Sequence, residues 1–221
     1  IHRDVKPDNM CVDENWKLTL LDFGLARVID RDNQMTSERG THPYMSIEMI
    51  DGWSGSYNET VDIWSIGAIF CELLTGETFF TAENAKHPLD AAINKLGPVP
   101  ESVLDQISDE KAQARFKRKS RGAERIDFTE YFEDNGQSWL VDEIEQNKEN
   151  LVDFIDYALQ FEPVRRMPVD FALAHPLLTE VRDLPREVVA AQAIPEEEPL
   201  PAGEEGLIEV KKRIRREIEA A

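Results

Sequence analysis

The eight residues His-Arg-Asp-Val-Lys-Pro-Asp-Asn at positions 2–9 constrain this chain more than any other segment. Asp22-Phe23-Gly24 begins 13 residues after Asn9. Between the two motifs, the apolar runs Met10–Val12 and Leu18–Leu21 flank a polar turn, a pattern that predicts a short β-hairpin. Because a hairpin brings its two ends together, we expect both motifs to lie in one place.

The two motifs resemble the signature of protein kinases, and that resemblance implies phosphoryl transfer from ATP, which needs metal ions to neutralise phosphate charge and a positioned hydroxyl group. Asp4 would accept or orient the proton of the substrate hydroxyl, and Lys6 would offset charge on the moving phosphoryl group. Asn9 and Asp22 would hold Mg²⁺ through oxygen atoms, the ligands that this hard cation prefers. Taken singly, each residue is more simply a solvated turn residue, so the prediction depends on their occurring together.

The two motifs resemble the catalytic loop and the Asp-Phe-Gly segment of eukaryotic serine/threonine protein kinases, and the resemblance extends over residues 1–180. It implies a protein-kinase-like fold, namely the mainly α large C-terminal lobe with a short β-hairpin. It also implies ATP and Mg²⁺ as cofactors, and structural or regulatory roles for His2, Arg3, Phe23 and Gly24. The chain has no counterpart of the small β-rich lobe. We therefore expect a kinase fragment that transfers no phosphate by itself.

A second group of residues is similar to the end of a kinase activation segment. Gly40-Thr41 precedes Glu48, and by this resemblance Thr41 would join Asp4 and Lys6 as a catalytic residue. Arg166 stands where kinases place the arginine that pairs with that glutamate. Loss of one member of such a buried pair leaves a costly lone charge. An ordinary surface ion pair is the alternative interpretation.

The apolar run Ile63–Leu74 predicts a central helix that is buried on nearly all faces. Asp62, directly before it, resembles the kinase aspartate that holds the backbone of the His2-Arg3 turn, although an ordinary helix cap would also explain it. Both cysteines, Cys11 and Cys71, lie among apolar residues and are expected to be buried thiols of a reducing compartment.

The remaining chain is predicted to be mainly helical, followed by a polar tail. Residues 109–150 are rich in charge and are expected to be irregular and exposed, and an acidic Pro/Glu-rich linker is expected over residues 181–206. A striped amphipathic helix is predicted over residues 207–221. Helical spacing or boundary residues predict further helices at Leu89–Leu96, Val103–Ile107, Leu151–Leu159 and Pro168–His175, with a short one near Ser46–Ile50.

Within the kinases, the chain is most similar to the mitogen-activated protein (MAP) kinases. The resemblance is carried by Cys71–Gly76 with the following Phe79-Phe80, and by Ile93–Pro100. It implies protein substrates, an upstream kinase that acts on the activation loop, and basic docking peptides as partners. Glu196, Glu197 and Glu198 resemble the acidic docking patch for such peptides, although a flexible acidic linker explains them equally well.

The activation segment departs from the MAP-kinase pattern. The Thr-x-Tyr phosphorylation site is replaced by Thr36-Ser37-Glu38, and His42 and Met45 replace two arginines expected to read the phosphotyrosine. Thr36 could still be phosphorylated and pair with Arg3. Glu38 either substitutes for one phosphate charge or is simply a solvated acid. Met45 also removes a residue of the pocket for a proline after the target residue, so proline-directed specificity does not carry over.

Overall charge restricts the partners. The chain has 25 Lys and Arg residues against 44 Asp and Glu, a formal charge of −19, which argues against nucleic acid and anionic membranes. The most apolar run is too short to cross a bilayer, and the first residues do not form a signal peptide, so a cytoplasmic or nuclear location is expected.

Two functional hypotheses follow. In the first, the full-length protein is a MAP-kinase-type serine/threonine kinase, because Asp4, Lys6, Asn9 and Asp22 are all intact. In the second, it is a kinase-like scaffold or regulator that binds basic docking peptides and has lost regulated catalysis. The first is favoured, because drift usually removes the metal ligands once catalysis is abandoned.

Overall fold

The computed structural model describes residues 1–27, 42–49, 53, 57–81, 88–137 and 147–187 of the chain. The chain divides into two units, Ile1–Arg182 and Asp183–Ala221. The described part of the second unit is residues 183–187, which include the short 3-10 helix η7 (Leu184–Arg186). All other described elements belong to the first unit.

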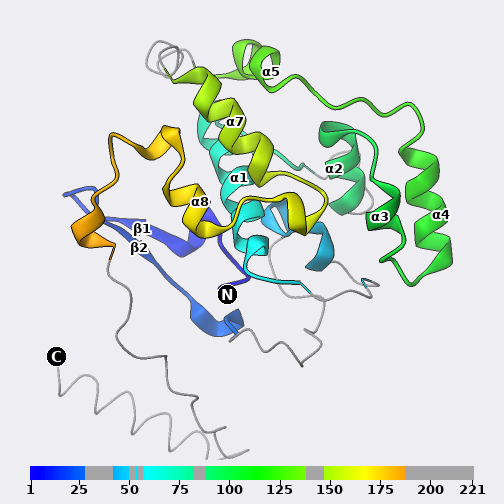
Figure 1. Ribbon diagram of the computed structural model, residues 1–221, viewed down its shortest axis with the longest axis horizontal. Coiled ribbons are helices and arrows are strands. Elements are labelled where there is room, and N and C mark those ends of the chain that lie inside the picture. The colour runs from blue at the N-terminus through cyan, green and yellow to red at the C-terminus, as the bar shows by residue number, and fades with distance from the viewer. Residues whose placement is uncertain (28–41, 50–52, 54–56, 82–87, 138–146, 188–221) are drawn as a thin grey trace, which may run out of the picture. The chain divides into compact units, whose positions relative to one another are not determined.

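Helix α1 (Thr60–Thr75) runs through the centre of the first unit (Figure 1). Its side chains are buried on nearly all faces, including Val61, Trp64 and Cys71, as the apolar run predicts. The helix ends where Gly76 adopts the left-handed conformation, with φ of 77°, and donates its N–H to Glu72 O at 2.7 Å. The predicted central helix is therefore confirmed.

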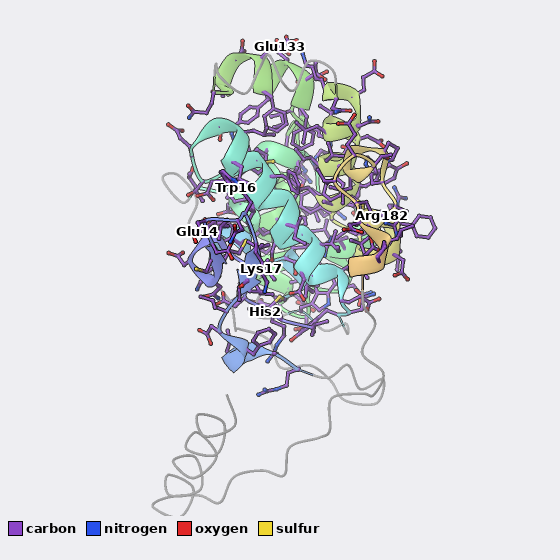
Figure 2. The ribbon with its side chains drawn as sticks, turned by 90° about the vertical axis from the view of Figure 1, so that its left-hand side faces the viewer. His2, Glu14, Trp16, Lys17, Glu133 and Arg182 are labelled. Carbon is purple, nitrogen blue, oxygen red and sulfur yellow. The ribbon has the colours of Figure 1, made fainter. Side chains whose placement is uncertain are left out.

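The predicted hairpin is also confirmed. Strands β1 (Met10–Val12) and β2 (Leu18–Leu20) pair antiparallel, with Met10 opposite Leu20, and Trp16 lies at the tip (Figure 2). The burial of Cys11 is a wrong prediction, because its thiol is exposed, whereas Cys71 is buried. Of the residues of β1, Met10 is half-buried and packs against the core, whereas Cys11 and Val12 beyond it are exposed.

Helix α7 (Lys148–Ala158) packs directly on α1, as the spacing of its apolar residues predicts. The contact depends on Gly67, because a Cβ atom at that position would lie 2.8 Å from Ala158 Cβ. Helix α5 (Phe128–Asn135) contacts both of these helices. An aromatic cluster lies beside α5: the ring of Phe79 is tilted against that of Phe128, with centroids 6.1 Å apart, and meets the ring of Tyr131 edge to face at 5.7 Å.

The prediction that residues 109–150 are irregular is wrong, whereas their exposure is confirmed in that every described residue of this range except Phe116, Phe128 and Phe132 is exposed or half-buried. This range holds helix α4 (Glu110–Lys119), helix α5 and the start of α7. Both α4 and α5 begin at an aspartate that caps the first turn: Asp109 accepts from Lys111 N at 2.9 Å, and Asp127 accepts from Thr129 N at 2.8 Å. Only one residue of α4, Phe116, is buried, which is too few to produce a visible apolar period.

Short elements complete the unit. The predicted helices at residues 89–96 and 103–107 are α2 (Pro88–Leu96) and the shorter α3 (Glu101–Leu104). The helix expected near residue 48 is a 3-10 turn, η4 (Ile47–Met49), preceded by η3 (His42–Tyr44). Among the described helices, none combines the length and apolar character that a bilayer crossing needs. The remaining short elements are η1 (Pro7–Asn9), η2 (Phe23–Leu25), η5 (Pro163–Arg165), α8 (Val169–Leu173) and η6 (Pro176–Leu178).

Candidate active site

The two N-terminal motifs lie against each other along their length. Leu21 N donates to Asn9 O at 2.8 Å, which continues the hairpin ladder by one step toward Asp22. Arg3 Nε donates to Leu25 O at 2.6 Å, so the side chain of one motif closes on the backbone that follows the other. The ring of His2 meets that of Phe23 edge to face, with centroids 5.0 Å apart.

The hydrogen bonds of His2 determine its tautomer. Its Nδ1 atom accepts from Asp4 N at 3.3 Å, while Nε2 lies 3.0 Å from Leu21 O. A carbonyl oxygen only accepts, so in this arrangement Nε2 is the donor to Leu21 O. The imidazole therefore ties the backbone of Asp4 to the segment that leads into Asp22.

Asp62 holds the turn that carries the catalytic-loop residues. Its two carboxylate oxygens accept from His2 N and Arg3 N, each at 2.8 Å. Arg3 needs this support because its φ of 70° lies in the left-handed region, which costs a residue with a Cβ atom on the order of 1 kcal/mol. The contact predicted for Asp62 is present, and it fixes the backbone that presents Asp4.

Two side chains of the same motif, Lys6 and Asn9, contact the carboxylate of Asp4. Lys6 Nζ lies 2.9 Å from Asp4 Oδ2. Asn9 Nδ2 donates to Asp4 O at 2.8 Å and to Asp4 Oδ2 at 3.0 Å. The carboxylate is buried, with 8% of the residue exposed, and these contacts leave it little freedom to rotate. The structure thus brings the predicted base, lysine and amide together.

The remaining oxygens of Asn9 and Asp22 suit a hard divalent cation. Because Asn9 uses its amide nitrogen on Asp4, its Oδ1 atom is left for another partner, and no described residue supplies a hydrogen bond to it. Asp22 is exposed, with φ of 57°, and its Oδ1 accepts from Gly24 N at 3.1 Å. Its Oδ2 atom likewise has no hydrogen-bond partner in the part of the chain that is described.

Asn9 and Asp22 together offer few oxygen ligands, and a small number of protein ligands is typical of Mg²⁺ sites. Within the described ranges, no group of three His, Cys, Asp or Glu side chains is placed to hold a metal ion by itself. Mg²⁺ is commonly bound through one or two carboxylates together with water and substrate phosphates rather than by an all-protein cage. Asn9 and Asp22, at the ends of a hydrogen-bonded hairpin, fit this mode of binding.

Arg3 is a buried cation with unused hydrogen-bonding capacity. The residue is 3% exposed, its Nη1 donates to Tyr57 Oη at 3.0 Å, and its Nη2 has no hydrogen-bond partner among the described residues. It forms no salt bridge with any described carboxylate. A buried guanidinium group without a counter-charge is costly, so an anion that reached Nη2 would be stabilised.

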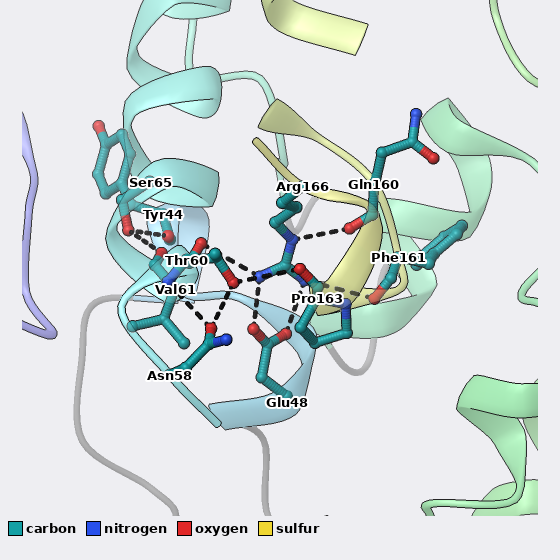
Figure 3. Close-up of polar contacts among 10 residues, drawn as sticks. All are labelled: Tyr44, Glu48, Asn58, Thr60, Val61, Ser65, Gln160, Phe161, Pro163 and Arg166. Atoms are coloured by element: carbon teal, nitrogen blue, oxygen red, sulfur yellow. Dashed lines mark hydrogen bonds and ion pairs between the residues drawn. The ribbon is translucent and has the colours of Figure 1, made fainter. Parts of the chain in front are cut away.

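The predicted pair of Glu48 and Arg166 is present, and it is fully buried (Figure 3). Both side chains have no exposed surface, and the contact is bidentate, with Arg166 Nη2 2.8 Å from Glu48 Oε2. Arg166 Nε also donates to Gln160 O at 2.8 Å, and the guanidinium group lies over the ring of Trp64. The pair therefore joins η4 to α1 and to the segment that follows α7.

A further anchor was missed by the sequence reasoning. Tyr44 Oη donates to Glu72 Oε2 at 2.6 Å, and Ser65 Oγ donates to Tyr44 O at 2.8 Å, both on α1. Burial, followed by the hydrogen bond to Glu72, raises the pKa of Tyr44 well above its ordinary value, so the phenol stays protonated. The available signal was Ser65, a hydroxyl within an otherwise apolar helix.

Several predicted residues lie outside the described residues. These are the activation-segment positions Thr36, Glu38 and Thr41 and the proposed docking residues Glu196, Glu197 and Glu198. The acidic docking patch, the phosphorylation site at Thr36 and the catalytic role of Thr41 therefore stay predictions. The same holds for the amphipathic helix over residues 207–221.

Comparisons with known proteins agree with this geometry. Residues 1–178 match a family model described as the protein kinase domain. The chain is 35% identical over 190 residues to the mitogen-activated protein kinase HOG1 of Eremothecium gossypii, covering 86% of the chain and 39% of that protein. It is also 35% identical to HOG1 of Wallemia muriae, and 34% identical over 191 residues to mitogen-activated protein kinase p38b of Drosophila melanogaster. The chain spans 63% of the former and 48% of the latter.

Proposed function

The chain belongs to the protein kinase family, and on that basis we propose that its residues 1–180 form the C-terminal lobe of an ATP- and Mg²⁺-dependent serine/threonine kinase of the MAP-kinase type. The observation that carries the proposal is the cluster around Asp4, in which Lys6 and Asn9 contact one carboxylate oxygen. Asn9 and Asp22 each offer an oxygen atom at the same end of the hairpin. Lys6 followed by Pro7 is of the serine/threonine type.

In this proposal Asp4 acts on the substrate hydroxyl. Its carboxylate, restrained by Asn9 and Lys6, accepts the proton of an incoming serine or threonine hydroxyl and aims the oxygen at the terminal phosphate. General-base catalysis of this kind contributes on the order of 10²–10⁴-fold to a rate. Lys6 offsets the charge of the transferred group. Mg²⁺, when bound through Asn9 and Asp22, would supply neutralisation of phosphate charge.

A substitution at Asp22 in the full-length protein tests the proposal. Asp22→Asn removes one carboxylate charge and should abolish ATP-dependent phosphorylation of a protein substrate, measured by transfer of labelled γ-phosphate. Asp8→Asn is the matched control, because Asp8 is an exposed acid of the same motif and has no proposed role. Retained turnover in the Asp22 variant, or equal loss in both variants, would contradict the assignment.

Regulation forms a second part of the proposal. Phosphorylation of Thr36 by an upstream kinase would supply an anion to Nη2 of Arg3, which is buried and has no hydrogen-bond partner in the described ranges. The proposed protein substrates, the basic docking peptides that Glu196–Glu198 would bind, and a cytoplasmic or nuclear location rest on the resemblance and on charge. The 221-residue chain by itself is proposed to be inactive, since none of its segments resembles the glycine-rich loop that covers ATP.

The alternative function is a kinase-like scaffold or regulator. It is favoured by one observation, the altered activation segment, in which Glu38 replaces the tyrosine and Ser46-Ile47 replaces Ala-Pro. Binding of Mg²⁺-ATP to the full-length protein separates the two functions. The kinase requires nucleotide binding that is lost in Asp22→Asn, whereas the scaffold would bind its partner peptides equally well in both forms.

A further inference from the structure

Helix α4 is an exception in an acidic chain. The eleven residues 111–121 contain six of the 25 Lys and Arg residues and no acidic residue, although the formal charge of the chain is −19. Figure 1 shows α4 on the opposite side of α1 from the β-hairpin, so this charge is remote from the candidate active site. A local positive field within a negative chain favours an anionic partner at this place.

A buried carboxylate organises part of this charge. Asp90 on α2 is 1% exposed, and its Oδ2 atom contacts both Arg115 and Lys119 of α4, with Lys119 Nζ at 3.0 Å. One negative charge therefore meets two positive charges, and the trio keeps a net charge of about +1. Within the described part of the chain, Asp90 Oδ1 has no hydrogen-bond partner, so both cations share the single Oδ2 atom.

A pocket of about 460 Å³ lies beside this trio, between the C-terminal half of α2 and the end of α4. Its polar lining consists of Asn94, Lys119, Arg121 and Glu124, together with the turn at Gly122-Ala123. The volume is within the range of about 300–1,000 Å³ that is usual for ligand sites. In the described part of the chain, Arg121 has no carboxylate partner, so its guanidinium group is available at the pocket wall.

The pocket wall is held in place from both sides. Ile126 N donates to Lys95 O at 3.0 Å, and Leu96 pairs with Arg125, so the loop after α4 is tied to the end of α2. Val99 N donates to Ser120 Oγ at 3.1 Å, which fixes the turn from the other direction. The cations are thus presented by a preformed loop, which lowers the ordering cost of binding.

We propose that this pocket binds the phosphate monoester of a phosphorylated serine or threonine in a peptide. A phosphate monoester carries nearly two negative charges and three acceptor oxygens, enough to engage the Lys119 ammonium and the Arg121 fork together. Glu124 disfavours a bare anion and favours a ligand that also brings a donor, such as the backbone N–H of a peptide.

A discrete phosphate fits the charge distribution better than an anionic membrane does. A membrane presents an extended negative surface to the whole chain, whose formal charge is −19. A single phosphate group in the pocket meets mainly the charges within a Debye length, about 8 Å at physiological ionic strength. No residue of the candidate active site lines the pocket, so the proposal stands or falls independently of the kinase function.

The test is a titration of the ¹⁵N-labelled 221-residue chain, followed by amide chemical shifts. The probes are the blocked peptide acetyl-Ala-phosphoSer-Ala-amide, its unphosphorylated counterpart and inorganic phosphate. We expect the phosphopeptide to shift the amides of Asn94 and residues 122–124, with an affinity that falls as salt is raised. The unphosphorylated peptide should shift none of them.

Two variants locate the interaction. Arg121→Gln should weaken phosphopeptide binding by about tenfold or more, the effect of losing one charge-assisted contact. Arg118→Gln, an exposed neighbour that does not line the pocket, should stay within about twofold of the original affinity on the same reasoning. Unchanged binding in Arg121→Gln, or equal shifts with the unphosphorylated peptide, would overturn the proposal. Equal affinity for inorganic phosphate would overturn its assignment to a peptide.

Discussion

Two regions of the first unit use buried polar groups in opposite ways. Around Arg166, every charged group is matched inside the chain, because Glu48 and the carbonyl oxygens of Gln160, Thr60 and Phe161 accept its hydrogen bonds. Around the catalytic loop, residues 2–9 and 22–24, the matching is incomplete, because no described residue accepts from Arg3 Nη2 and Asp22 is exposed. We name these regions the Arg166 anchor and the catalytic loop.

This difference distinguishes the Arg166 anchor, which stabilises the fold, from the catalytic loop, which has atoms available to bind a ligand. A satisfied buried pair holds elements together and offers nothing to a ligand. A loop that keeps a left-handed residue at Arg3 and another at Asp22 is held there by its surroundings, and its unmatched atoms are available to an anion or a cation. Substitutions in the anchor should therefore change stability, whereas substitutions of the unmatched groups should change binding.

The largest expected effect is at the anchor. Arg166→Met leaves the carboxylate of Glu48 buried without a partner, and the free energy of unfolding should fall by about 3–5 kcal/mol in a denaturant titration. The double variant Glu48→Leu/Arg166→Met removes both charges and should recover most of that loss. If the single variant were as stable as the original chain, the anchor would not be a support.

The second largest effect is expected at Asp62, which connects helix α1 to the backbone of the catalytic loop. Asp62→Ala removes the acceptor of two backbone N–H groups, His2 N and Arg3 N, and should lower the free energy of unfolding by about 2–3 kcal/mol. Asp62→Asn keeps one acceptor oxygen and should lose about half as much. Hydrogen exchange at these two amides provides a local readout, and unchanged protection in the alanine variant would contradict the role of Asp62.

A packing change should have a smaller effect. Gly67→Ala places a Cβ atom 2.8 Å from Ala158 Cβ, so α1 and α7 must separate, at a cost of about 1–2 kcal/mol. The compensating variant Gly67→Ala/Ala158→Gly restores the space and should recover part of the stability. Equal thermal midpoints for the original chain and Gly67→Ala would show that the helices are less closely packed than described.

The smallest effect is expected at Ser46, a residue near the Arg166 anchor that is fully buried. In the part of the chain that the structure describes, its Oγ atom has no hydrogen-bond partner. Ser46→Ala removes this hydroxyl and should leave the free energy of unfolding unchanged or raise it by up to about 1 kcal/mol. A loss of stability in a calorimetric measurement would reveal a partner for this hydroxyl.

Features with long or repeated signals could be predicted from the sequence. The hairpin follows from two apolar runs around a turn, and α1 follows from an apolar stretch with few polar interruptions. The pairing of Glu48 with Arg166 joins residues 118 positions apart, and it was accessible only through the resemblance to a family. No local pattern specifies such a distant partner.

Features that depend on single side chains could not be predicted. Helix α4 has one buried apolar residue, Phe116, and its start is marked only by the capping side chain of Asp109. The contact of Tyr44 with Glu72 joins a loop to a helix, and polar contacts across elements leave no periodic trace. The exposure of Cys11 depends on what packs against the hairpin, which its neighbours in the chain do not reveal.

The central claim is that Asn9 and Asp22 form one cation site beside Asp4. Its most direct test is to add Mn²⁺-ATP to the ¹⁵N-labelled chain, because the paramagnetic ion broadens the resonances of nearby nuclei. We predict selective broadening at the amides of Asn9, Asp22 and Asp4 that is lost in Asp22→Asn, whatever weak broadening occurs at exposed acids elsewhere. Broadening that spares Asn9 and Asp22, or that persists there unchanged in the variant, would contradict the claim.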